Sequence, residues 1–137
     1  LIHRNDRALL RLLENTIKKY DLSVGMFHFL RVLWQQDGLS QKALGEAAGL
    51  RSSTTAAALD QMEKKALILR QKNKTDQRIY NIFLTQAGLD LEQQVLPEIK
   101  KLNTLVLKKL TTQEQEQLLD LLTKATESVE DAEKSLA

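Results

Sequence analysis

The chain has 137 residues, a formal net charge of +2, 28% charged residues, one proline and no cysteine. The lack of cysteine excludes disulfides, thiol redox sensing and Cys-ligated zinc in this sequence. No apolar run reaches the roughly 18 residues of a membrane span. We therefore expect one domain, or one compact module with helical extensions, in the cytoplasm, with no cofactor and no membrane partner. Because the sequence begins at Leu1, we also expect its termini to be trimmed.

The N-terminal part predicts two helices. Leu9, Leu13, Ile17 and Tyr20 follow helical spacing, which indicates a helix from about residue 3 to residue 20. Ser23 is a suitable N-cap for a second helix through Trp34. This second helix is apolar on most sides, which is typical of a helix in the middle of a domain.

Two further helices and a hairpin are predicted next. Ser40 caps a short helix, and the break after it falls at Gly49. A second helix begins near Ser52 or Ser53. Residues 68–72 and 79–84 are predicted to be strands, joined by the polar turn NKTDQR. The residues predicted to face the core are Leu44, Ala47, Thr55, Leu59, Met62 and Ala66, and those predicted on the outer face are Ser53, Thr54, Ala57, Ala58, Gln61 and Lys65.

The C-terminal part is again helical. Thr85 caps a long helix, which Pro97 is expected to kink or interrupt. Thr111 with Glu114 forms a capping-box pattern for the last helix. Apolar residues in that helix repeat at heptad-like spacings, which indicates an interface between two copies of the chain. The predicted dimer interface consists of Leu9, Leu118, Leu122, Ala125, Val129 and Leu136.

A helix, a tight turn, a second helix and a basic hairpin, in this order, are typical of a winged helix-turn-helix. The predicted fold is mainly α with a small β-hairpin wing, and with long N- and C-terminal dimerisation helices. We expect an N-terminal dimerisation helix (1–22), a DNA-binding lobe (23–88) and C-terminal dimerisation helices (89–137), forming one compact module. Basic residues concentrate between positions 50 and 80 and acids after 111, which suits one face presented to a polyanion.

The middle half of the chain contains five stretches in order: LSVGMFHFLRVL, GLSQKALGEAAGL, SST, LDQMEKKALI and DQRIYNIFLTQAG. This ordered set, which includes Asp76-Gln77-Arg78 in the wing, resembles the MarR family of dimeric bacterial repressors. The flanking helices match in pattern only. Three positions depart from the family pattern. Ala57 stands where a basic residue is common, Ala66 where glycine is usual, and Met26 where glutamine is frequent.

The resemblance implies a triangular homodimer whose terminal helices interlock and whose two winged lobes straddle a pseudo-palindromic operator on double-stranded DNA. Family members often lose operator affinity when a small aromatic or phenolic ligand binds between the dimer helices and the DNA lobe. We therefore expect a homodimeric transcriptional regulator, a repressor released by such a ligand. The three departures bear on the operator sequence and affinity, not on the fold.

The DNA-binding candidates lie in the two short helices and the wing. We expect one of Ser52, Ser53 and Thr54 to cap its helix and the others to contact phosphates or bases. Arg51 either reaches a guanine edge or is a solvated surface arginine. The resemblance implies that Asp76 aims Arg78 into a narrow minor groove, where the negative potential is enhanced. The full predicted set is Ser40, Gln41, Arg51, Ser52, Ser53, Thr54, Gln61, Lys65, Arg70, Lys72, Lys74, Asp76 and Arg78.

His28 and Arg31 flank the apolar helix and are candidates to touch an anionic effector, with Leu13 and Ile17 as pocket walls. Core packing is the alternative for those two apolar residues. The only other histidine is His3, and neither histidine has an acid at a ligand-like spacing, so we expect no metal site. No nucleophile–base arrangement is present, so we expect no enzymatic activity. The alternative function is a winged-helix protein-interaction module that acts through its helical tail.

Overall fold

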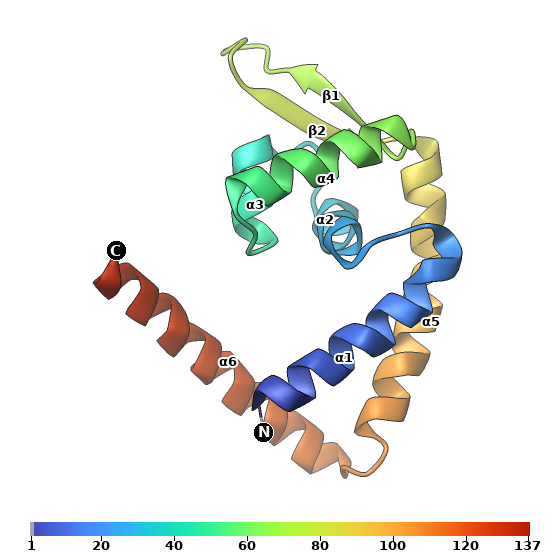
Figure 1. Ribbon diagram of the computed structural model, residues 1–137, viewed down its shortest axis with the longest axis vertical. Coiled ribbons are helices and arrows are strands. Elements are labelled where there is room, and N and C mark those ends of the chain that lie inside the picture. Colours follow the sequence, from blue (N-terminus) through green and yellow to red (C-terminus); the bar gives the residue numbers. More distant parts are fainter. Residues whose placement is uncertain (1) are drawn as a thin grey trace. The chain divides into compact units, whose positions relative to one another are not determined.

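The computed structural model describes residues 2–137, which form six α-helices and a two-stranded antiparallel sheet (Figure 1). This confirms the predicted class of a mainly helical chain with a hairpin wing. The chain divides into two compact units, the described residues up to Leu102 and residues Asn103–Ala137. The three segments expected from the sequence remain a prediction. The elements are α1 (Ile2–Ile17), a 3₁₀ turn (Lys18–Tyr20), α2 (Val24–Gln35), α3 (Gln41–Ala47), α4 (Ser52–Lys64), β1 (Ile68–Lys72), β2 (Tyr80–Leu84), α5 (Gln86–Leu107) and α6 (Thr112–Leu136).

Most helices begin at the residues whose side chains can cap them. Ser23 Oγ accepts from the Met26 amide at 3.2 Å, and Ser40 Oγ accepts from the Ala43 amide at 3.1 Å. Thr85 Oγ1 likewise accepts from the third amide of α5 at 3.2 Å. In the second unit, Thr111 and the side chain three residues on complete the predicted capping box of α6. These predictions are confirmed, because each depends only on residues three positions apart.

The core of the first unit is built around α2, as predicted. α2 contacts α1, α3, α4 and β2. The side chains that are fully or almost fully buried include Ile17, Met26, Phe27, Phe29, Leu30, Leu33, Leu44, Leu59, Met62, Ile82 and Val95. At about 25 cal/mol per Å² of apolar area, burial on this scale is the main stabilising contribution to the lobe.

The predicted inward face was wrong at two alanines. Ala47 is exposed, because α3 has only seven residues and its inward positions are Leu44 and Gly45. Ala66 is also exposed, because α4 ends at Lys64 and Ala66 lies beyond the helix with a φ of 56°. Ala58, expected on the outer face, packs partly against the core.

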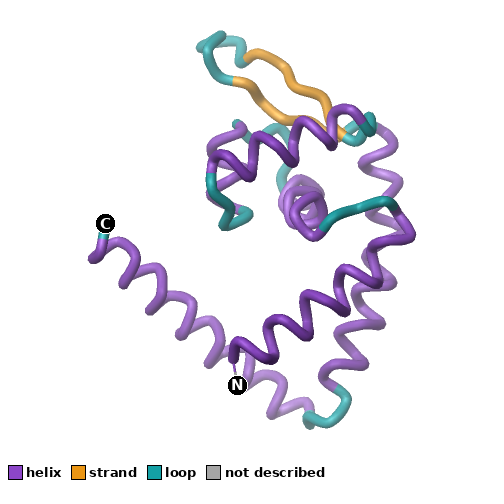
Figure 2. The backbone as a smooth tube through the Cα atoms, in the orientation of Figure 1, coloured by secondary structure: helices purple, strands orange, loops and turns teal. Residues whose placement is uncertain are grey.

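The wing is a short antiparallel hairpin whose base is attached to the segment before α3. β1 pairs with β2 from Ile68 opposite Leu84 to Lys72 opposite Tyr80. The amide of Gly38 donates to the Ile82 carbonyl at 3.0 Å, beside an isolated bridge that joins Ser40 to Asn81. Figure 2 shows the two strands leading to a loop at the far end of the hairpin.

α5 is continuous from Gln86 to Leu107, so Pro97 does not interrupt it, contrary to one of the two expected outcomes. The start of α5 is held in the first unit by Trp34, whose Nε1 donates to the Gly88 carbonyl at 2.9 Å. α6 has no buried residue along its 25 positions. None of the helices between residues 2 and 137 is both long and apolar enough to cross a bilayer.

Candidate nucleic-acid interface

The first turn of α4 lies open at the surface. Arg51 occupies the N-cap position, and no side chain accepts a hydrogen bond there. Ser52, Ser53 and Thr54 are exposed, and their hydroxyls have no hydrogen-bond partner among the residues that the structure describes. The prediction that one of these three caps the helix was therefore wrong, because the helix begins one residue earlier than a hydroxyl cap would require. The uncapped turn leaves amide donors and three hydroxyls available to an acceptor outside the chain.

The turn between α3 and α4 brings the two helices into close contact. A Cβ added to Gly45 would lie 2.8 Å from Thr55 Oγ1, so only glycine permits this approach. Thr55 is 3% exposed, and its hydroxyl donates to the Arg51 carbonyl at 2.9 Å. The side chain of Thr55 therefore fixes the start of α4 against α3.

The wing presents one arginine to solvent. The Arg78 side chain is 90% exposed, and its Nε and Nη2 donate to the two carboxylate oxygens of Asp76, each at 3.0 Å. The guanidinium lowers the pKa of the Asp76 carboxyl from its ordinary value, mainly through this side-chain hydrogen bond and then through the backbone amide of Arg78. The Asp76 carboxyl therefore stays ionised near neutral pH, and its ion pair with Arg78 is bidentate.

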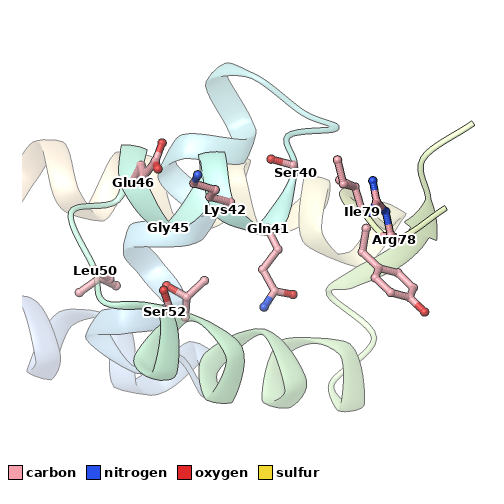
Figure 3. A pocket seen from close by; sticks show the side chains of 11 residues that line it. Ser40, Gln41, Lys42, Gly45, Glu46, Leu50, Ser52, Arg78 and Ile79 are labelled. Carbon is pink, nitrogen blue, oxygen red and sulfur yellow. The ribbon is translucent and has the colours of Figure 1, made fainter. Parts of the chain in front are cut away.

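A cavity of about 600 Å³ lies between α3, the start of α4 and the start of β2. Figure 3 shows Gln41 pointing from α3 into the space beside α4, with Ser52 on the helix start and Arg78 on the wing. Four predicted DNA-binding residues line the cavity, namely Ser40, Gln41, Ser52 and Arg78. The lining residues outside the predicted DNA-binding set are Lys42, Gly45, Glu46, Leu50, Thr55, Ile79 and Tyr80. The alternating pattern of the second strand did not indicate that Tyr80 is exposed beside the cavity.

Two basic candidates are already paired within the chain. Arg70 lies 2.7 Å from an Asp60 carboxylate oxygen and 3.1 Å from one of Glu63, and its side chain is only 19% exposed. Lys65 pairs with Asp21. Arg70 projects from β1 toward α4, so its guanidinium joins the wing to that helix. The remaining candidates Gln61, Lys72 and Lys74 are exposed.

The side chains of the four effector-pocket candidates differ in their exposure to solvent. Ile17 is completely buried and Leu13 packs against the core, while His28 is half-buried and Arg31 is exposed. Burial, and then the charge of Arg31, lowers the pKa of His28 below its ordinary value. A second cavity of about 860 Å³ lies between α1, residues 21–26 and the end of α4, and none of the four candidates lines it. The effector site stays a prediction.

The predicted dimer residues are all exposed in the single chain. On α6, Leu118 is 37% exposed, and Leu122 and Val129 are more than half exposed. Leu9, Ala125 and Leu136 are exposed as well. No partner in the second unit covers this side of α6. Its apolar stripe is of the kind that marks an interface.

The comparisons with known proteins agree with this geometry. The model of the MarR family matches residues 22–80, from the turn before α2 to the first residue of β2. Over this winged-helix segment the chain matches the MarR family. It is 24% identical to the HTH-type transcriptional regulator YwaE of Bacillus subtilis over 123 residues, which cover 90% of this chain and 72% of YwaE.

Solved structures of MarR-type regulators match nearly the whole chain. The crystal structure of the transcriptional regulator SlyA has a TM-score of 0.91 at 24% identity and covers 99% of this chain and 96% of its own. A MarR-family regulator from Listeria monocytogenes, in complex with 26mer DNA, has a TM-score of 0.88 at 27% identity and covers 96% and 87%. The winged-helix fold of MarR-type regulators is thereby confirmed for this chain.

Proposed function

We propose that the protein is a homodimeric regulator that inserts α4 into the major groove of an operator and lays Arg78 of the wing beside it. One observation supports this most directly. The open first turn of α4 and the exposed Arg78 border the same cavity. The first turn offers hydrogen-bond donors that the chain does not use, and Arg78 offers a guanidinium that Asp76 holds in a fixed position. The DNA complex of the Listeria relative supports the same use of the fold.

In the major groove, the start of α4 acts as a donor surface. The uncapped amides of the first turn and the hydroxyls of Ser52, Ser53 and Thr54 suit phosphate oxygens, since the helix dipole also favours an anion there. Arg51, exposed at the N-cap, is long enough to reach the N7 and O6 acceptors of guanine. Gln41 adds an amide from α3, and the small exposed Ala57 permits close approach to the groove floor.

In the wing, two kinds of contact are separated by position. Arg78 enters the minor groove, where a narrow A·T-rich segment attracts a guanidinium. Lys72 and Lys74 contact phosphates, which add affinity without sequence information. Arg70 and Lys65 keep their ion pairs with acids of the lobe and hold the wing and α4 in place.

Two copies of the chain form the functional unit through their terminal helices. The exposed apolar residues of α6 and Leu9 of α1 supply the buried surface that dimerisation needs. A twofold-symmetric dimer reads a pseudo-palindrome whose half-sites lie about one helical turn apart, roughly 34–36 Å. Occupation of such an operator blocks transcription, so the regulator acts as a repressor.

A small aromatic acid releases the repressor. Arg31 offers a cation to its carboxylate, and His28, which is neutral at pH 7 because of its lowered pKa, offers a ring nitrogen. The ligand weakens DNA binding only if it binds the DNA-incompatible arrangement of the dimer better, and DNA must then weaken ligand binding by the same factor. Thiol-based sensing is not available to a sequence without cysteine.

The decisive experiment is selection of bound duplexes from a random library, followed by titration of the selected duplex at several salt concentrations. We expect a pseudo-palindromic consensus and a log–log slope of roughly −0.9 for each phosphate neutralised. Retention of no duplex at low salt, with folded protein, would overturn the proposal. Repeating the selection with salicylate-like acids tests the effector, since loss of binding together with thermal stabilisation of the protein identifies a ligand.

A further inference from the structure

We propose that two asparagines, Asn73 and Asn81, are positioning residues for the wing arginine. The structure assigns to them a relay of hydrogen bonds from the backbone before α3 to the carboxylate that holds Arg78. This inference rests on the proposed contact of Arg78 with DNA, and it adds the reason why an exposed side chain keeps one orientation.

The relay begins inside the lobe. Asn81 on β2 donates from Nδ2 to the carbonyl oxygen of Gly38 at 2.7 Å, across 43 positions of sequence. Asn81 Oδ1 then accepts from Nδ2 of Asn73 at 3.0 Å. Both side chains are half-buried, so these bonds are partly shielded from water. The loop is thereby attached to the segment that leads into α3.

Asn73 continues the relay into the tip. Its Oδ1 accepts from the amide of Thr75 at 2.9 Å, from the hydroxyl of Thr75 at 2.7 Å and from the amide of Asp76 at 3.1 Å. Its own amide donates to the Ile79 carbonyl at 2.8 Å, which closes the loop. An asparagine that bonds the backbone two and three residues on replaces a backbone turn, so it sets the direction of Asp76.

Asp76 completes the relay. One carboxylate oxygen accepts from both the amide and Nε of Arg78, and the other accepts from Nη2, each at 3.0 Å. An exposed ion pair contributes little to stability, so the network is better suited to orientation than to folding. Holding the guanidinium before DNA arrives reduces the side-chain entropy that binding must remove.

The orientation of both amides is determined by their backbone partners. Amide donors from Thr75 and Asp76 require the oxygen of Asn73 on their side, which turns its NH₂ group toward Asn81. The Gly38 carbonyl requires the NH₂ group of Asn81 on the other side. Donors and acceptors therefore alternate along the whole relay, and no other residue type combines both groups at this length.

The first test is a double-mutant cycle of DNA affinity with Arg78→Ala on the selected operator. We expect Asn73→Ala and Asn81→Ala each to weaken binding about fivefold or more in the wild-type background and less than about twofold in the Arg78→Ala background. Gln71→Ala is the matched control, because Gln71 is exposed, lies directly opposite Asn81 in the hairpin and makes no hydrogen bond through its side chain within residues 2–137. Equal losses in both backgrounds would overturn the relay.

The second test needs no DNA and therefore separates this inference from the proposed function. In the free full-length protein, the Nε–H proton of Arg78 should exchange slowly with water and be visible by NMR. Asn73→Ala and Asp76→Ala should abolish that signal, and Gln71→Ala should preserve it. Preservation in Asn73→Ala overturns the relay, while loss of the signal together with unchanged DNA affinity of Arg78→Ala overturns only the wing contact. If Asn73→Ala does not fold, Asn73→Asp keeps the acceptor for the loop amides and removes the donor to Asn81, and an intermediate loss of the signal is expected.

Discussion

Replacing Ala66 by glycine should stabilise the protein. Ala66 follows the C-cap of α4 with a φ of 56°, in the left-handed region. Its amide donates to the Glu63 carbonyl and the next amide, of Leu67, donates to the Met62 carbonyl, both at 2.9 Å. These two bonds form a Schellman motif, in which the left-handed residue is usually glycine. The Cβ of Ala66 therefore destabilises this helix end sterically, and glycine would remove that strain.

The size of the effect follows from two opposing contributions. A non-glycine residue in the left-handed region costs roughly 1–2 kcal/mol. Glycine in place of alanine lowers stability by about 0.4–1 kcal/mol, because the unfolded chain then has more conformations to lose on folding. We expect a net gain of about 0.5–1 kcal/mol, and at roughly 2.1 cal/mol/K per residue of unfolding entropy this raises Tm by about 2–3 °C.

The assay is thermal unfolding at one fixed protein concentration, because association makes Tm depend on concentration. Ala57→Gly is the matched control, since Ala57 is exposed in the interior of the same helix, where glycine costs about 1 kcal/mol. The same substitution should therefore change Tm in opposite directions at two positions nine residues apart in sequence. An unchanged or lowered Tm for Ala66→Gly would show that the helix end is not strained there.

Gly88→Ala should lower the free energy of unfolding in urea by about 2–3 kcal/mol, because the added Cβ would lie 2.3 Å from the Leu67 carbonyl oxygen and the backbone would have to move. A loss below about 0.5 kcal/mol would contradict this packing. The lowered pKa of His28 means that the folded protein binds this proton less readily than the unfolded chain, so the free energy of unfolding should fall as the pH drops below about 6.5. His28→Gln should reduce that fall between pH 7.5 and 5.5. Equal pH dependence in both proteins would refute a role for His28. Leu122→Glu should shift the sedimentation equilibrium toward the monomer, because a charge would enter the proposed interface. Gln117→Glu, at a second exposed position on α6, should leave the equilibrium unchanged. A dimer in both variants would place the interface elsewhere.

Features that depend on neighbours in sequence were predictable. The caps at Ser23, Ser40 and Thr111 each bond an amide three residues on, so their residue types and spacing sufficed. The bounds of β1, residues 68–72, were also predicted correctly from the sequence. Arg78 and Asp76 are two residues apart, so their pairing was also within reach of the sequence.

Features that depend on distant residues were decided by the tertiary structure. Arg70 was predicted to contact DNA, yet its guanidinium lies between Asp60 and Glu63, because the hairpin folds back along α4. The relay of the two asparagines joins a wing tip to Gly38, and no pattern around either asparagine indicates it. Hydrophobic spacing and caps select local conformation within a few residues, whereas the partner of a charge or an amide is set by which segments the core brings together. The amino-acid sequence by itself therefore determined the elements and the resemblance to the MarR family, and the packing of the wing on the lobe decided which polar side chains remain exposed and unpaired.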